Sequence, residues 1–285
     1  MDRRSFLQAG AAAALGVAGI NAYAMRGAKV VVIGGGYGGA TAAKYIRLLS
    51  KQRIEVTLVE PDQTFISCPL SNLVLGGSRT LADLSRPYSL LTKQHGVTHA
   101  RDVAVAVDPV ARTVKLAGGG TLSYDKLVMS PGIDLNLASI EGLPAAQQQG
   151  KILQAWKAGP ETTALRKQLE AMPDGGVYAL TIPEAPFRCP PGPYERACQV
   201  AFYFKQHKPK SKVLVFDANQ DVVSKPALFK KAWADRYAGI VEYHNQHKAV
   251  AVSAAEGIIK FDVHDSVKAD VINALPAMRA NKIAT

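Results

Sequence analysis

The sequence has few cysteines and no long uninterrupted apolar run. Three cysteines in 285 residues are too few for a disulfide framework, and the odd number leaves at least one unpaired. No apolar stretch is long enough to cross a bilayer as a helix. Hydrophobic residues make up 48% of the chain and charged residues 20%, which excludes collagen, coiled coil and intrinsic disorder. The length then predicts a globular chain of about two domains.

Negative charge is also in deficit, since 34 lysines and arginines face 23 acidic residues and leave a net charge of +11. Such a charge could suit nucleic acid, an anionic surface or an acidic partner. The basic cluster at residues 205–212 is typical of a solvated helix end. His244 and His247 have helical spacing for a metal but lack acidic or cysteine companions, so we predict no metal site. Nothing in these patterns indicates nucleic-acid binding.

The first 24 residues have the pattern of an export signal. Residues 2–8 read Asp-Arg-Arg-Ser-Phe-Leu-Gln, a twin-arginine motif, and an alanine- and glycine-rich stretch follows over residues 9–20. Ala22-Tyr23-Ala24 supplies a small-x-small cleavage site. An amphipathic structural helix is the alternative, but the glycines disfavour it. We therefore predict twin-arginine export to the bacterial periplasm, a route that carries proteins already folded around a cofactor.

A glycine-rich turn follows the first buried strand. Residues 29–33 form a β-branched run, Gly34-Gly35-Gly36-Tyr37-Gly38-Gly39 comes next, and residues 40–50 have a helical pattern. In such a turn Gly34 permits the tight bend, Gly36 lets the backbone approach a pyrophosphate, and Gly39 allows close packing of helix on strand. The helix N-terminus adds a favourable dipole for phosphate. This succession predicts a dinucleotide-binding domain.

A second strand over residues 54–59 ends at Glu60, 21 residues beyond Gly39. A carboxylate at this place binds the ribose hydroxyls of an adenosine. Because an acid stands there rather than an arginine, a 2′-phosphate is disfavoured. The sequence therefore favours FAD or NAD over NADP.

A second glycine fingerprint is missing. A helix is expected over residues 151–170, with Trp156, Leu165 and Leu169 on its apolar side, and a new strand over 175–182. The segment 183–193 then holds five prolines and one glycine. A pyrophosphate cradle needs glycine room and backbone N–H donors, and proline supplies neither. A helix at 194–206 and a strand at 212–217 keep the αβ pattern, so we predict a second dinucleotide-type domain that has lost its nicotinamide site.

Four features in order resemble the flavoprotein subunit of flavocytochrome c sulfide dehydrogenase. They are the export signal, the G-G-G-Y-G-G turn, Cys68-Pro69-Leu70-Ser71-Asn72, and the proline-rich stretch from Pro186 to Arg196 that contains Cys189. Residues 121–132, which we predict to be a strand running into a Pro-Gly turn, also resemble the Y-D-x-L-V-x-A-x-G element of glutathione-reductase-like flavoproteins. The resemblance runs from Lys29 to the end of the chain. It implies an α/β fold of two Rossmann-like domains of the glutathione-reductase-like FAD/NAD(P)-binding type.

The resemblance assigns roles to two of the cysteines. It implies that Cys68 joins FAD through a thioether to the 8α-methyl group, against the alternative of a buried structural cysteine. It implies that Cys189 is one half of a redox disulfide that sulfide attacks, giving a persulfide and a thiolate that reduces the flavin. Arg188 could lower the pKa of Cys189 or attract HS⁻. Glu195 is the implied acid/base, although both charges also suit an ordinary surface or helix start.

The remaining features are the third cysteine and two elements that the sequence lacks. Cys198 could pair with Cys189, but a buried free thiol is favoured, and the resemblance places the redox partner cysteine in a later segment. No Gly-Asp dipeptide is present, although such flavoproteins use one near the FAD ribityl chain. We therefore expect an FAD domain lacking its C-terminal part, and a chain that alone is not a competent sulfide dehydrogenase.

These expectations give a domain division and a function. The division is an export signal (1–24), the first part of the FAD-binding domain (25–145), a second dinucleotide-type domain without an NAD(P) fingerprint (146–276), and the start of a return to the FAD domain (277–285). The predicted activity is electron transfer from sulfide through FAD to a c-type cytochrome. No C-x-x-C-H haem motif is present, so haem belongs to a partner subunit. The alternatives are a sulfide:quinone oxidoreductase and a non-catalytic accessory flavoprotein.

Overall fold

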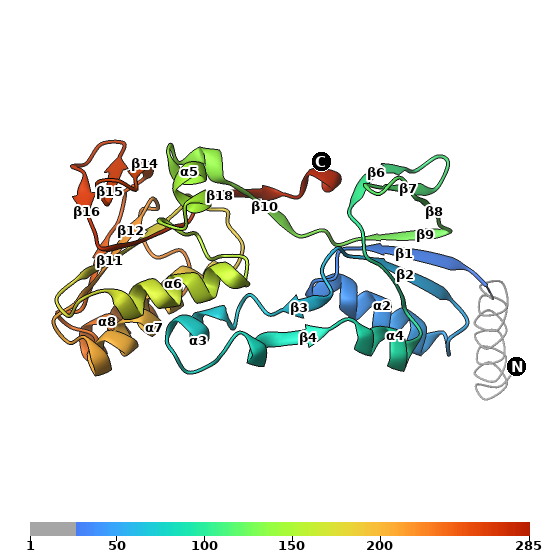
Figure 1. Ribbon diagram of the computed structural model, residues 1–285, viewed down its shortest axis with the longest axis horizontal. Helices are drawn as coiled ribbons and strands as arrows, with labels where there is room; N and C mark the ends of the chain where they lie inside the picture. Colours follow the sequence, from blue (N-terminus) through green and yellow to red (C-terminus); the bar gives the residue numbers. More distant parts are fainter. Residues whose placement is uncertain (1–26) are drawn as a thin grey trace, which may run out of the picture. The chain divides into compact units, whose positions relative to one another are not determined.

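The computed structural model describes residues 27–285, so the predicted export signal lies outside the described residues. The chain forms two compact units (Figure 1). The first comprises residues 27–65, 86–132 and 281–285, and the second comprises residues 66–85 and 133–280. The second unit thus includes the Cys68 segment, which the sequence analysis placed in the FAD-binding range.

The first unit is built on a four-stranded parallel sheet with strand order β5-β2-β1-β9. Its strands are β1 (Lys29–Ile33), β2 (Glu55–Val59), β5 (Thr98–Ala100) and β9 (Lys126–Met129). The helices are α2 (Tyr37–Leu49) and α4 (Ser89–His95), and the outer strands are β6 (Ala104–Asp108), β7 (Thr113–Leu116) and β8 (Thr121–Ser123). Residues 121–132, expected as one strand, are two strands in separate sheets.

Both faces of this sheet are covered, which explains why β1 is a continuous apolar run. Val30 and Val32 pack with the apolar side of α2 and with Tyr88. Val31 and Ile33 point the other way and pack with residues of the β6-β7-β8 sheet. Since successive side chains alternate across a strand, this arrangement needs an apolar residue at each position from Val30 to Ile33.

The second unit repeats the plan with a parallel sheet of order β13-β12-β11-β17. Its strands are β11 (Val177–Ile182), β12 (Lys212–Asp217), β13 (Val241–His244) and β17 (Val271–Ala274). Its helices are α3 (Ser71–Leu75), α5 (Leu143–Gln148), α6 (Pro160–Ala171), α7 (Gly192–His207) and α8 (Pro226–Arg236). An antiparallel sheet joins β14 (Ala249–Ser253), β15 (Ile258–Phe261) and β16 (Val267–Lys268), and β10 (Ile133–Asn136) pairs with β18 (Ala277–Ala280).

The two faces of β11 again enter different cores. Tyr178 and Leu180 pack with apolar residues of α6, α7 and α8. Ala179 faces the other side, where the core is formed with α5 and the β14–β16 sheet. The short elements that complete the chain are β3 (Thr64–Ile66), β4 (Ser85–Pro87) and three 3₁₀ turns at Ala82–Leu84, Leu137–Ser139 and Lys282–Ala284.

The predicted helix over 151–170 is wrong in its first half. The helix begins only at Pro160, and Ala155 has a left-handed φ of 44°. Leu153 instead forms a parallel bridge with Asn273, beside β17. Proline at the first helical position cannot continue a helix from upstream. Trp156 is buried as expected, but it lies on an irregular segment rather than on a helix face.

No helix within residues 27–285 is both long enough and apolar enough to cross a membrane.

Candidate active site

The glycine turn between β1 and α2 leaves room for a ligand. Gly39 packs against the strand so closely that a Cβ would lie 1.8 Å from the carbonyl oxygen of Gly34. A Cβ on Gly36 would meet no atom within 4 Å. Gly36 is the N-cap of α2, where no side chain caps the helix and no acidic residue stands in the first turn. The turn therefore fits the pyrophosphate of a dinucleotide.

Glu60 lies beside this turn. Its Oε2 accepts a hydrogen bond from the backbone N–H of Gly35 at 2.7 Å, and its Oε1 accepts one from the N–H of Asp62 at 3.1 Å. Tyr88 also belongs to this site, although no sequence motif indicated it. Its hydroxyl donates to the carbonyl of Gly35 at 2.7 Å. Burial raises the pKa of Tyr88, and the charges of Glu60 and Asp62 raise it further. Only the fold brings Tyr88 to the turn, because 53 residues separate it from Gly35.

Cys189 lies in the loop between β11 and α7. Its φ is 62°, in the left-handed region, and its carbonyl accepts a hydrogen bond from the N–H of Gly192 at 2.8 Å. A Cβ on Gly192 would lie 2.7 Å from the Trp156 ring and 3.0 Å from the sulfur of Cys189. The single glycine of the proline-rich loop therefore serves close packing around the thiol.

Positively and negatively charged groups shift the pKa of the Cys189 thiol in opposite directions. Burial raises the pKa of Cys189, and the negative charge of Glu195 raises it further. The N–H of Gly192 and the charges of Arg188 and Arg196 act in the opposite direction. Arg188 thus affects the pKa in the direction expected from the sequence, but burial outweighs it. Its Nη2 donates to the carbonyl of Trp156 at 2.9 Å.

Cys68 is half-buried and lies on the short segment that precedes α3. Its sulfur accepts a hydrogen bond from the N–H of Ala158 at 3.4 Å, and its carbonyl accepts one from the Ser71 hydroxyl at 2.6 Å. The irregular segment that holds Trp156 and Ala158 therefore contacts both Cys68 and the loop of Cys189. All three cysteines are free thiols in this structure, and burial raises the pKa of Cys198 within α7.

Arg196 and Asn72 are further residues of this region that sequence reasoning did not select. Arg196 is 1% exposed, and its Nε donates to the Asn72 side-chain oxygen at 3.0 Å. The amide nitrogen of Asn72 donates to the carbonyl of Gly192 at 3.0 Å. The only signal in the sequence was the presence of both residues in the two cysteine motifs.

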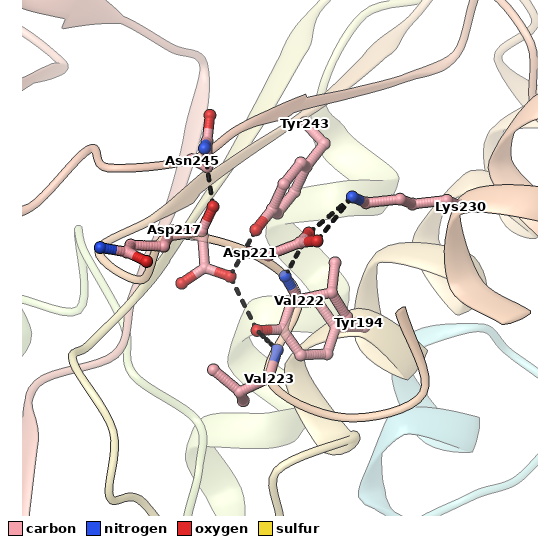
Figure 2. A network of polar contacts seen from close by, with 9 residues as sticks. Tyr194, Asp217, Asp221, Val222, Val223, Lys230, Tyr243 and Asn245 are labelled. Carbon is pink, nitrogen blue, oxygen red and sulfur yellow. Dashed lines mark hydrogen bonds and ion pairs between the residues drawn. The ribbon is translucent and has the colours of Figure 1, made fainter. Parts of the chain in front are cut away.

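Asp217 ends β12, where a ribose-binding acid would stand if this unit bound a second dinucleotide. Figure 2 shows that the carboxylate is instead held by the protein itself. Its Oδ2 accepts from the hydroxyls of Tyr194 at 2.7 Å and Tyr243 at 2.9 Å. Its Oδ1 accepts from the backbone and side-chain N–H groups of Asn219 at 3.0 and 2.7 Å. Both oxygens therefore accept hydrogen bonds from within the protein.

The fold and the first-unit turn define the class of protein. Residues 28–168 match the pyridine nucleotide-disulphide oxidoreductase family. The structure of the sulfide:quinone oxidoreductase from Aquifex aeolicus superposes with a TM-score of 0.72 at 21% identity, covering 90% of this chain and 60% of that one. The chain thus has the two-dinucleotide fold of flavoprotein oxidoreductases, as predicted.

The sequence of the second unit indicates a more specific family. Residues 162–276 match the family described as the central part of the sulfide dehydrogenase [flavocytochrome c] flavoprotein chain. The flavoprotein chain of this name from Chlorobaculum thiosulfatiphilum is 59% identical over 46 residues, which is 16% of this chain and 94% of that sequence. The chain belongs to the family of flavocytochrome c sulfide dehydrogenase flavoprotein chains.

More distant relatives are sulfide:quinone oxidoreductases. The mitochondrial protein of Dictyostelium discoideum is 23% identical over 269 residues, which is 90% of this chain and 57% of that protein. The mitochondrial protein of Mus musculus is 27% identical over 191 residues, which is 65% of this chain and 41% of that protein. The chain therefore spans about half the length of these two relatives.

Proposed function

We propose that this chain is the FAD-binding subunit of a periplasmic enzyme that oxidises sulfide and passes electrons to a c-type cytochrome subunit. The observation that carries the proposal is the Cys189 loop. It lies between β11 and α7, where a second glycine turn would stand in a protein that uses two dinucleotides. It carries a half-buried thiol within the field of two arginines and Glu195. The loop is suited to sulfur chemistry rather than to binding a nicotinamide nucleotide.

FAD, when bound, supplies a centre that accepts an electron pair and can release electrons singly. The residues of this chain would hold and orient it. The turn at Gly34 and Gly36 and the N-terminus of α2 would bind the pyrophosphate, and Glu60 would offer its carboxylate to the ribose hydroxyls.

Cys189 is the proposed point of attack by sulfide. When its sulfur is in a disulfide, HS⁻ forms a new S–S bond to it, and the bond to the partner sulfur breaks. The electron pair of that bond leaves on the partner thiolate, and Cys189 becomes a persulfide. Arg188 would favour the approach of the anion, and Glu195 would exchange the proton.

This role predicts the result of removing the thiol. In the protein purified from its host with any subunit that accompanies it, Cys189→Ser is expected to lower sulfide-dependent cytochrome c reduction at least about 10³-fold, because serine cannot form a persulfide. Cys198→Ser, on the helix that follows, is expected to leave the rate unchanged. Anaerobic stopped-flow measurement with added sulfide checks both. A Cys189→Ser protein as fast as the parent would overturn the proposal.

The periplasmic location and the cytochrome partner are supported by the twin-arginine pattern and by the absence of a haem motif from the sequence. The family name itself denotes the flavoprotein chain of a flavocytochrome. The second candidate is a quinone-linked enzyme, favoured by the two mitochondrial relatives. The same assay separates the two: a copurifying haem subunit and reduction of cytochrome c support the first, and reduction of a short-chain quinone alone supports the second.

We further propose that Cys68 tethers FAD through a thioether. Its sulfur is half-buried rather than enclosed and is held by the N–H of Ala158. Flavin fluorescence is expected to migrate with the polypeptide on a denaturing gel and to disappear in Cys68→Ala, because only a covalent bond survives denaturation. Cys198→Ala is the matched control and is expected to keep the signal. Emission that persists in Cys68→Ala would show that the tether lies elsewhere.

A further inference from the structure

Arg196 is a buried cation whose direct partners are neutral. Its guanidinium donates four hydrogen bonds within the described chain: to Asn72 Oδ1 at 3.0 Å, to the carbonyl of Gln154 at 3.1 Å, to Asn273 Oδ1 at 2.7 Å and to the carbonyl of Ala155 at 2.8 Å. The side chain is 1% exposed. Among residues 27–285, no carboxylate forms an ion pair with it. A buried charge of this kind is costly unless an anion compensates it.

The four hydrogen bonds connect the segments that carry the thiols. Asn72 is four residues beyond Cys68 and also donates to the carbonyl of Gly192, in the loop of Cys189. Residues 154 and 155 precede Trp156, whose ring lies 4.9 Å from the guanidinium carbon of Arg196. Removing the guanidinium would therefore weaken the links between the Cys68 segment, the Trp156 segment and the start of α7, although the bonds from Asn72 to Gly192 and from Ala158 to Cys68 would remain.

The charged and titratable groups that act on Arg196 include both thiols. They are Tyr178 on β11, Glu161 in the first turn of α6, Cys189 and Cys68. The Glu161 carboxylate accepts its hydrogen bonds from the backbone and side-chain N–H groups of Gln154 rather than from Arg196, and it keeps its negative charge while doing so. The Tyr178 hydroxyl donates to Asn273 Oδ1 at 3.0 Å, and burial keeps it protonated by raising its pKa. Beside Glu161, the two thiols are the groups acting on Arg196 that can become negative.

We propose that Arg196 is a positioning residue of the cysteine centre: its guanidinium holds the two cysteine segments in place and, together with Arg188, supplies positive charge that stabilises the Cys189 thiolate. The inference rests on the role of Cys189 proposed above and extends it to a residue of the protein interior. The only chemical change involved is the ionisation of the thiol, which releases its proton to solvent. Cys189 is also faced by Arg188, by Glu195 and by the N–H of Gly192, so the effect of Arg196 must be measured against theirs.

The rate of iodoacetamide alkylation, measured for each cysteine by peptide mass spectrometry across pH, tests the proposal. Arg196→Met is expected to slow alkylation of Cys189 about tenfold near neutral pH and to move its midpoint about one pH unit upward. Arg196→Lys keeps the charge and is expected to keep most of the rate. The matched control is Arg166→Met, because Arg166 also lies over an aromatic ring, that of Tyr203, and donates to the carbonyl of Leu75. It is expected to leave Cys189 unchanged.

Two further measurements keep the test decisive if Arg196→Met does not fold. Asn72→Asp places a carboxylate on the guanidinium and pairs its charge, so it is expected to slow Cys189 alkylation in the same direction. In the unaltered chain, Cys189 is expected to ionise at a lower pH than Cys198. Glu195 acts on both thiols, but arginines act only on Cys189. Reversal of that order, or an unchanged Cys189 profile in a folded Arg196→Met or Asn72→Asp protein, would overturn the proposal.

The test needs neither sulfide nor FAD, so its result is independent of the assay for the proposed function. If Cys189→Ser retains sulfide oxidation while Arg196→Met shifts the thiol, the proposed function fails and the positioning role stands. If the first result is as expected and the second is not, Arg196 is structural only.

Discussion

Replacing Gly39 with alanine is expected to destabilise the first unit by about 3 kcal/mol or more and to abolish flavin binding. The new methyl group would lie 1.8 Å from the carbonyl oxygen of Gly34 and 3.2 Å from a methyl group of Val32. Both neighbours belong to a closely packed turn and strand, so α2 must move away from the sheet, and overpacking of this severity exceeds the usual cost. Denaturant unfolding and the flavin content of the purified protein check the result.

Gly36→Ala is the matched control, three residues earlier in the same turn. Its backbone has φ −66° and ψ −169°, which alanine adopts without strain, and its Cβ would enter open space. We expect stability close to that of the parent but markedly weaker flavin retention, because the methyl group would occupy the place reserved for phosphate. A Gly36→Ala protein that retains flavin fully would contradict the assignment of the turn.

Replacing Asp217 with alanine is expected to cost at least about 2 kcal/mol of the free energy of unfolding. The carboxylate is fully buried and accepts hydrogen bonds from Tyr194, Tyr243 and Asn219. Its removal leaves two tyrosine hydroxyls and the Asn219 N–H groups without their acceptor in the protein interior, and each unsatisfied group carries its desolvation cost. Thermal or denaturant unfolding checks this value.

Asp221 provides the control, since it lies in the same view (Figure 2) and is paired with Lys230 at 2.7 Å. Both side chains of this pair are half-exposed, and exposed ion pairs contribute about 1 kcal/mol or less. Asp221→Ala is therefore expected to change stability little. Equal losses in the two variants would mean that the Asp217 network does not stabilise the fold.

The Asp217 network also bears on the cysteine loop. Tyr194 stands in the first turn of α7, five residues after Cys189, and its hydroxyl both donates to Asp217 and accepts from the N–H of Val223 at 3.1 Å. An acid at the end of β12, where another protein would bind a ribose, here fixes the start of the helix that follows the Cys189 loop.

The local sequence determined much of the fold. Apolar runs predicted β1 and β12 at their observed bounds, because buried parallel strands need apolar side chains on both faces. The glycine turn and Glu60 were also predictable, since their spacing reflects contacts within a single βαβ unit. The predicted helix at 151–170 was wrong at its start because Gly159-Pro160 ends one segment and begins another, and apolar content alone does not reveal such a boundary.

What the sequence by itself determined, then, was the class of fold, the dinucleotide turn and the three thiols. Only the tertiary structure decided that the Cys68 segment belongs to the second unit, that Asp217 is closed off by two tyrosines, and that Arg196 is buried between residues 72, 154 and 273. The physical reason is sequence separation. The hydrogen bonds of Arg196 span 41 to 124 residues, and a contact of that range leaves no periodicity or spacing in the chain from which it can be recognised.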